Sequence, residues 1–216
     1  LGVWDRFEDI DFDTLPDQFV LKCTHDSGGL VVVRDRSDLD WVSAKNKIAC
    51  SLKNNYYLHG REWPYKDVKP RILAEQYMNN TGNQRDAAEL TDYKFMCFHG
   101  RVDNIFTATG RYSGSGIQVA FFDRDWNKLP VTRRYSAGGG NLERPKNLEK
   151  MISLAEILSK DVPFLRVDFY EVAGKIYFGE LTFFPASGME AFEPESWDLK
   201  LGELIDLSQV NNKQIP

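Results

Sequence analysis

The chain has 216 residues, of which 42% are hydrophobic and 27% are charged, and this composition excludes an intrinsically disordered chain. Its length suffices for one large domain or two small ones, with a sizeable core. The net charge of −5 argues against broad, non-specific binding to nucleic acids, and no stretch reaches the roughly 18 apolar residues of a membrane-spanning helix.

Three cysteines, Cys23, Cys50 and Cys97, are an odd number without the spacing of a redox or zinc motif. They indicate a reduced, cytoplasmic setting rather than a disulfide framework. The sequence shows no signal peptide and does not start with methionine. Its opening residues, LGVWDRFEDIDFDTLP, read like the middle of a longer protein. We therefore expect an N-terminal truncation.

The first third of the chain is expected to form a hairpin and a helix. The apolar segments 18–23 and 30–35 flank a turn rich in glycine and serine, which predicts paired strands. Residues 37–58 carry apolar side chains at helical spacing, and Ser37 is a suitable N-cap. Prolines follow in a connector, and we place a domain boundary near residue 70.

The rest of the chain is expected to be rich in strands, with one clear helix. Strands are predicted at 71–78, 92–100, 102–110, 118–123, 164–170 and 176–184, and the helix at 147–161. This order of elements predicts an α+β fold with mostly antiparallel sheets.

The segment 164–185 places charged side chains on a predicted hairpin of apolar strands. Because side chains alternate along a strand, Arg166 and Asp168 share one face, and Glu180 and Thr182 share a face of the partner strand. A symmetric hairpin sets Asp168 opposite Glu180 and Arg166 opposite Thr182. Two carboxylates brought together need a cation, and Mg²⁺ with substrate phosphates satisfies that need. The alternative is an exposed strand face that carries an Arg–Asp ion pair.

Lys22 lies in an apolar strand just before a turn that contains Ser27, Gly28 and Gly29. Glycine lets backbone N–H groups approach phosphate oxygens closely, and a lysine adds a positive charge. The order of residues is not that of a P-loop. Read alone, the pattern fits equally well an edge-strand lysine beside an ordinary hairpin turn.

Two further short patterns have a binding interpretation and a simpler one. Residues 75–78 end a strand near the expected boundary and can present backbone groups to a purine, but read alone they are better explained as a plain strand end. Asp92 and Lys94 share a strand face and can contact a ribose and a phosphate. Read alone, they are better explained by a surface ion pair.

Taken in chain order, these segments resemble the ATP-grasp family. FVLKCTHDSGG resembles its nucleotide-binding lysine and glycine-rich loop, ILAEQYM its adenine-binding hinge, DYKFMCFHG its ribose-binding strand, and LRVDFYEVAGKIYFGELTFFPASGM its metal-binding hairpin. The termini of this region resemble the TupA-like ATP-grasp family, linked to teichuronopeptide and other cell-surface polysaccharide synthesis. The resemblance implies two lobes that clasp ATP, residues 1–70 and 71–216, and an N-terminal domain that is missing here.

The resemblance also implies a role for each matching residue. The phosphates would be contacted by Lys22, Ser27, Gly28 and Gly29. The adenine would be contacted by Glu75, Gln76, Tyr77 and Met78, and the ribose by Asp92. The catalytic residues would be Arg166 and Lys94, and Mg²⁺ would be bound by Asp168, Glu180 and Thr182. Thr182 departs from the family pattern, which usually has asparagine at the third metal-ligand position. Ser187 and Met189 are expected at the acceptor end.

The activity implied is that of an ATP-dependent carboxylate–amine ligase with an acyl-phosphate intermediate, for example one that joins an amino acid to a uronic acid. The partners implied are a carboxylate-bearing saccharide, an amine and a polysaccharide-synthesis complex, in the cytoplasm or at the inner face of the plasma membrane. The alternatives are a sugar kinase, a catalytically inactive nucleotide-binding protein, and a glycosyltransferase. The last would use the acidic motif at 123–125, which we interpret as a turn.

Overall fold

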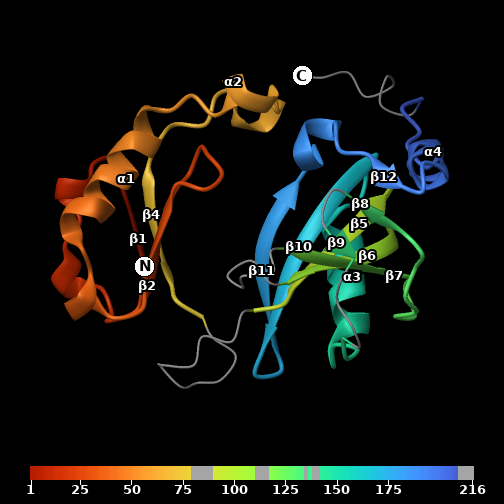
Figure 1. Ribbon diagram of the computed structural model, residues 1–216, viewed down its shortest axis with the longest axis horizontal. Helices are drawn as coiled ribbons and strands as arrows, with labels where there is room; N and C mark the ends of the chain where they lie inside the picture. The colour runs from red at the N-terminus through yellow and green to blue at the C-terminus, as the bar shows by residue number, and fades with distance from the viewer. Residues whose placement is uncertain (79–89, 110–116, 134–135, 138–141, 209–216) are drawn as a thin grey trace. The chain divides into compact units, whose positions relative to one another are not determined.

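The computed structural model describes residues 1–78, 90–109, 117–133, 136–137 and 142–208. The chain divides into two compact units, Leu1–Met78 and Asn79–Pro216 (Figure 1). Each unit contains helices and a sheet whose strands are mostly antiparallel. The predicted α+β class is therefore confirmed.

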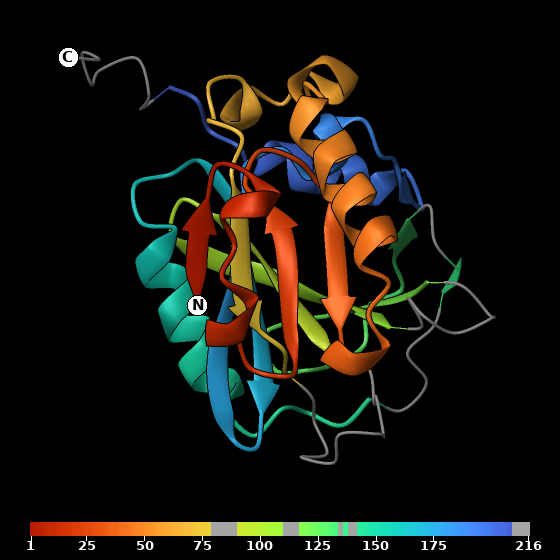
Figure 2. The ribbon, with the colours of Figure 1, turned by 90° about the vertical axis from the view of Figure 1, so that its left-hand side faces the viewer.

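The first unit is built on a four-stranded antiparallel sheet with the strand order β1–β4–β2–β3. Its strands are β1 (Gly2–Trp4), β2 (Phe19–Cys23), β3 (Leu30–Val33) and β4 (Ile72–Gln76). Helix α1 (Trp41–Lys53) lies against this sheet, as Figure 2 shows. The shorter elements are η1 (Phe7–Asp9), η2 (Phe12–Thr14), η3 (Arg36–Asp38), α2 (Tyr57–Gly60) and η4 (Trp63–Tyr65).

The core of this unit determines which way Lys22 points. Phe19 and Leu21 on β2 are fully buried, and they belong to one apolar cluster with Ala44 and Ile48 of α1. Because side chains alternate along a strand, Lys22 lies on the opposite face of the sheet. It is only partly buried there.

Helix α1 is shorter than the sequence predicted. It begins after Asp40, whose side chain accepts hydrogen bonds from the backbone N–H groups of Val42 and Ser43, and it ends before Asn54. The expected cap, Ser37, lies instead in η3, where it donates to Asp35. Aspartate is as strong an N-cap residue as serine, so the apolar spacing alone could not select between them.

The division of the chain falls after Met78, beyond the boundary predicted at residue 70. Strand β4, which the sequence analysis assigned to the second part, is the central partner of β1 and β2 in the first sheet. A connector with prolines marked the start of this strand, but it did not mark the end of the compact unit.

The second unit contains a six-stranded sheet with the order β11–β10–β5–β6–β7–β9, in which only the β7–β9 pair is parallel. Its strands are β5 (Asp92–Phe98), β6 (Arg101–Thr109), β7 (Gln118–Phe122), β9 (Ser136–Ala137), β10 (Phe164–Val172) and β11 (Lys175–Thr182). Outside this sheet lie β8 (Thr132–Arg133), α3 (Leu148–Leu158), η5 (Pro185–Gly188), β12 (Phe192–Glu193) and α4 (Ser196–Glu203).

The two faces of this sheet are covered by different elements. Phe95 and Val167 point toward α3 and form one apolar cluster with it. Met96 and Phe106 point the other way, into a cluster that includes Leu201 of α4. Lys94 and Arg166 are in phase with Met96 and therefore lie on this second face. The charged residues predicted from the sequence thus share the face opposite α3.

Candidate functional site

The hairpin of β10 and β11 brings four predicted site residues together. Arg166 pairs with Thr182, as the symmetric hairpin predicted. Val167 still pairs with Leu181, but the register then shifts, so that Gly179 and Glu180 together lie opposite Asp168. Such a bulge bends the strand and redirects its side chains. The expected opposition of Asp168 and Glu180 is therefore present, through a bulge that the sequence analysis did not include.

Arg166 bridges the two carboxylates of this hairpin. Its Nε donates to Oδ1 of Asp168 at 2.7 Å, and its Nη2 donates to Oδ2 at 2.8 Å. The same Nη2 also donates to Oε1 of Glu180. Asp168 is only 1% exposed, whereas the side chain of Glu180 is 56% exposed. The guanidinium therefore joins a buried carboxylate to an accessible one.

A lysine from the neighbouring strand completes the cluster. Lys94 pairs with Asp168 in the β5–β10 register, and its ammonium contacts that carboxylate. Its Nζ also lies 2.6 Å from Oδ2 of Asp92, and both side chains are less than 10% exposed. Asp92 and Lys94 do form an ion pair, but a buried one rather than the surface pair of the simpler interpretation.

Arg166 adds a positive charge between the two carboxylates of the hairpin. The sequence analysis expected a metal ion shared by Asp168 and Glu180, and the guanidinium of Arg166 contacts both of them. With Lys94 and Asp92 included, two cations face three carboxylates. An arginine fork matches a carboxylate with two parallel bonds, so it can neutralise a buried aspartate without a metal. The cluster keeps one excess negative charge, and Glu180 is its exposed member.

The oxygen atoms of this cluster suit Mg²⁺ when phosphate or water supplies the rest of its coordination shell. Carboxylate oxygens are the hard ligands that Mg²⁺ takes, and one or two of them with phosphates and water complete its shell. Thr182 donates to Glu180 at 3.2 Å and lies beside the same carboxylate. Within the described parts of the chain, no group of three or more His, Cys, Asp or Glu side chains could hold a metal ion. The set thus suits a metal carried by a phosphate ligand.

The protonation of Arg166 reflects its surroundings. Burial by itself would lower the pKa of this guanidinium, but the charge and hydrogen bonds of Asp168 and the charge of Glu180 outweigh it and raise the pKa above its usual value. Arg166 therefore remains a cation at neutral pH.

The first unit brings Lys22 and Glu75 together. Their side chains lie diagonally on the same face of neighbouring strands β2 and β4 and form an ion pair. Both side chains are more than 40% exposed, so water screens the pair and the groups are accessible. Lys22 is thus neither buried nor isolated; a phosphate that binds it must compete with Glu75.

The other predicted residues of the first unit lie in its turns and strand ends. Ser27 and Gly28 are exposed at the tip of the β2–β3 turn, and Gly29 is half-buried at its base. Gln76 is the last residue of β4 and is exposed, and Tyr77 and Met78, which follow it, are half-buried. These remaining phosphate and adenine residues therefore form two groups, one after the end of β2 and one at the end of β4, while Lys22 and Glu75 are in contact.

A buried ion pair next to the charge cluster was missed. Arg133 on β8 lies 2.6 Å from Glu190, and both side chains are about nine-tenths buried. The guanidinium of Arg133 also lies 4.8 Å from the ring centre of Phe106, the residue that pairs with Lys94. No local motif marks either residue, because the pair depends on the β8–β12 contact between distant segments.

The turn after β11, expected at the acceptor end, has an unusual backbone. Ala186, Ser187 and Gly188 have φ values of 48°, 59° and 70°, which are left-handed conformations. Non-glycine residues adopt them at a cost of about 1–2 kcal/mol each, and such strain clusters at binding sites. Met189, which follows, is 85% exposed.

The motif at 123–125 forms a turn, as expected. The carboxylate of Asp123 accepts hydrogen bonds from the backbone N–H groups of Asp125 and Asn127. Its oxygens are thus used by the local fold, and this arrangement does not support the metal-binding acidic motif of a glycosyltransferase.

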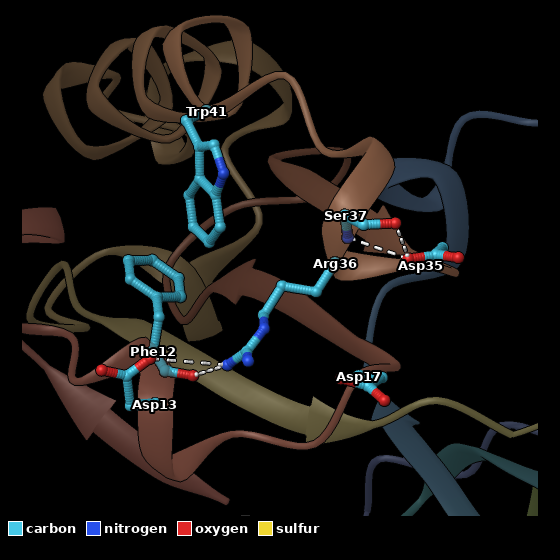
Figure 3. A pocket seen from close by; sticks show the side chains of 7 residues that line it. All are labelled: Phe12, Asp13, Asp17, Asp35, Arg36, Ser37 and Trp41. Atoms are coloured by element: carbon cyan, nitrogen blue, oxygen red, sulfur yellow. Dashed lines mark hydrogen bonds and ion pairs between the residues drawn. The ribbon is translucent and has the colours of Figure 1, made fainter.

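A concave surface of the first unit contains none of the predicted site residues. Figure 3 shows this pocket of about 580 Å³, which is lined by Phe12, Asp13, Asp17, Asp35, Arg36, Ser37 and Trp41. Arg36 donates to the carbonyl oxygen of Phe12 at 2.6 Å, and Ser37 donates to Asp35. Phe12 and Trp41 meet edge to face. These contacts stabilise the local turns, and we assign no function to the pocket.

The sequence model of a family described as TupA-like ATPgrasp matches residues 1–206. No curated protein sequence matches the chain. Among the described residues, no helix has the length and apolar character to cross a membrane.

Solved structures of D-alanine–D-alanine ligases are similar to the chain. The ligase from Bacillus anthracis shows 18% identity over 94% of this chain and 59% of its own, with a TM-score of 0.49. Its complex with ATP gives 16% identity, 94% and 57% coverage, and a TM-score of 0.46. The Helicobacter pylori enzyme gives 13% identity, 86% and 49% coverage, and a TM-score of 0.44. The chain thus spans less than two thirds of each of these proteins.

Proposed function

The chain belongs to the TupA-like ATP-grasp family, and from this premise we propose that it binds Mg²⁺–ATP and acts in an ATP-dependent ligase that joins a carboxylate to an amine. The observation that carries the proposal is the charge cluster of Arg166, Asp168, Glu180, Lys94 and Asp92. It combines buried cations with one accessible carboxylate on a single sheet face. Ion pairs buried in an otherwise apolar sheet recover little more than their desolvation cost, and proteins depart from apolar packing mainly at functional sites.

In this proposal each residue of the second unit has a defined role. Glu180, with Asp168 and Thr182, would hold the Mg²⁺ of the nucleotide, which would neutralise phosphate charge. Arg166 and Lys94 would stabilise charge on the transferring phosphoryl group. Asp92 would bind the ribose. Since Lys94 contacts both Asp92 and Asp168, nucleotide binding would have to rearrange this lysine.

The first unit would supply the remaining nucleotide contacts. Lys22 and the turn residues Ser27, Gly28 and Gly29 would contact the phosphates. Glu75 and the segment 76–78 would contact the adenine. The accessibility of the Lys22–Glu75 pair supports this assignment, because an exposed pair can separate at little cost.

The proposed reaction has two steps. A carboxylate oxygen of the substrate attacks the γ-phosphorus of ATP, which forms an acyl phosphate and releases ADP. The amine then attacks the acyl carbon, which forms the amide and releases phosphate. We further propose a carboxylate-bearing saccharide and an amine as substrates, in cell-surface polysaccharide biosynthesis, with Ser187 and Met189 at the acceptor end. The resemblance to the TupA-like family supports this choice of substrates.

A thermal-shift titration with Mg²⁺–ATP tests the nucleotide site. A ligand that binds only the folded state stabilises it by about 2.7 kcal/mol at 100 times its Kd. We expect a Mg²⁺-dependent rise in the melting temperature that is lost in Glu180→Gln. Glu180 is preferred to Asp168 for this test because its exposed side chain can be changed with little effect on the fold. No rise in the unaltered protein at millimolar Mg²⁺–ATP would contradict the proposal.

A further inference from the structure

His25 lies in the turn between β2 and β3 but is buried, with 4% exposure. Its Nε2 lies 3.1 Å from the carbonyl oxygen of Ser51 and 3.0 Å from that of Asn54, at the C-terminal end of α1. Because both partners are carbonyl oxygens, Nε2 must carry the hydrogen and donate to them. Within the described residues, Nδ1 has no hydrogen-bond partner. The imidazole is therefore held through Nε2.

Two further contacts fasten the same turn to the end of α1. The hydroxyl of Ser51 donates to Oδ2 of Asp26, next to His25. Gly29 lies so close to this hydroxyl that a Cβ atom there would overlap it. Ser51 thus meets the turn with its backbone and its side chain, and Gly29 allows the close approach.

The tip of the turn is exposed, whereas its base is held against the end of α1. Ser27 and Gly28 are exposed, and a Cβ added to Gly28 would meet no atom within 4 Å. The backbone at Gly28 has a φ of +101°, which favours glycine. The turn therefore combines a base fixed on both sides of its tip with a tip that is open to a ligand.

From this arrangement we infer that His25 is a positioning residue, which holds the tip of the turn in the conformation that binds nucleotide phosphates. This inference rests on the proposed function, which assigns the phosphates to Lys22 and the turn. A loop that is already ordered loses less conformational freedom when its ligand binds, so anchoring raises affinity without touching the ligand. His25 lies just before the tip residues, and its bonds to α1 fix the backbone from which they project.

Two variants separate this role from simple filling of the core. His25→Leu fills a similar volume with an apolar side chain, which cannot donate to the carbonyls of Ser51 and Asn54. His25→Gln carries an N–H donor at the same number of bonds from the backbone as Nε2 and can restore both contacts. A residue that only filled space would tolerate leucine better than glutamine.

Hydrogen–deuterium exchange of the nucleotide-free protein tests the anchor directly. In His25→Leu we expect the amides of residues 23–30 to exchange about tenfold faster, while those of β4 keep the rates of the unaltered protein. His25→Gln should return the turn to the slower rates. Unchanged exchange in the turn, or faster exchange throughout the first unit, would overturn the inference.

Calorimetric titration with Mg²⁺–ATP and with adenosine tests the consequence. We expect His25→Leu to weaken Mg²⁺–ATP about tenfold and adenosine not at all, because adenosine has no phosphates to contact the turn. Equal losses for the two ligands would contradict a role in phosphate binding. If the unaltered protein binds neither ligand, the proposed nucleotide site is wrong, and the exchange rates still decide whether His25 orders the turn.

Discussion

Arg166 and Asp168 lie two residues apart on one face of β10 and are joined by two nearly parallel hydrogen bonds of 2.7 and 2.8 Å. The same guanidinium reaches Glu180, so one cation serves a buried and an exposed carboxylate. The two acids therefore differ in what they do for the fold. Asp168 is the buried counter-charge of Arg166 and Lys94, whereas Glu180 could be lost with little harm to the structure.

The first prediction concerns stability at these two acids. In Asp168→Asn, Arg166 and Lys94 keep their charges but lose a buried partner, which should lower the free energy of unfolding by about 3–5 kcal/mol. Glu180→Gln alters an exposed side chain and should cost about 1 kcal/mol or less. Urea denaturation of both variants measures the difference. Equal losses would mean that Asp168 is not the buried counter-charge that its contacts indicate.

Alternation along strands was enough to predict the shared face of Arg166 and Asp168 and the pairing of Arg166 with Thr182, because a hairpin is a local structure. The bulge at Gly179 was not predicted, although a single glycine inside a strand pattern is a known sign of a bulge. The pairing of Lys94 with Asp168 joins residues 74 positions apart, and no local pattern reports such a contact.

The extent of the first unit was mispredicted for a related reason. A strand belongs to the sheet in which it finds partners, and β4 finds them in β1 and β2. The prolines before β4 indicated only where the connector lies. The Arg133–Glu190 pair likewise follows from a contact between distant segments. The start of α1 after Asp40 was missed for another reason, because both Ser37 and Asp40 are adequate N-cap residues.

The second prediction concerns Lys22 as a phosphate ligand. Lys22→Met removes a charged donor, and hydrogen bonds to charged groups contribute about 1.5–3 kcal/mol, so Mg²⁺–ATP should bind roughly 10- to 100-fold more weakly. Adenosine should bind as before. Lys69→Met is a matched control, because Lys69 pairs with Asp5 in an exposed ion pair of the same unit. Titration calorimetry measures both ligands, and a similar loss in the two variants would count against the assignment.

The third prediction concerns the bulge that presents Glu180. A Cβ on Gly179 would lie 3.0 Å from the carbonyl oxygen of Asp168 and 3.2 Å from the ring of Tyr170. Gly179→Ala should therefore push β11 away from β10, with a loss of about 1–3 kcal/mol in the free energy of unfolding.

Gly202→Ala is the control for this substitution. A Cβ on Gly202, within α4, would meet no atom within 4 Å, and alanine is favoured over glycine in helices by roughly 0.5–1 kcal/mol. The two Gly→Ala changes should thus alter stability in opposite directions in chemical denaturation. A neutral Gly179→Ala would show that the bulge can widen without cost.

The fourth prediction concerns thiol accessibility. Cys50 is exposed on α1, whereas Cys23 and Cys97 are buried. At pH 8, a disulfide reagent such as Ellman's reagent should modify one thiol rapidly in the native protein and all three only after denaturation. Cys50→Ser should abolish the rapid phase. A rapid phase that persists in this variant would indicate that one of the buried cysteines becomes accessible in the folded state.

The last prediction uses the ionisation of Cys97. Burial raises the pKa of this thiol to about 11, from an ordinary value of 9.0 in the unfolded chain. Its contribution to stability is therefore complete below pH 9 and is lost as the pH rises from 9 through 11, because the unfolded chain releases the proton first. The shift corresponds to about 2–3 kcal/mol. Cys97→Ala loses packing at every pH but has no thiol to ionise. The difference in unfolding free energy between the two proteins should therefore shrink as the pH rises. Denaturation from pH 8 to 10.5 measures this difference. A constant difference would mean that the thiol ionises equally in the folded and unfolded states.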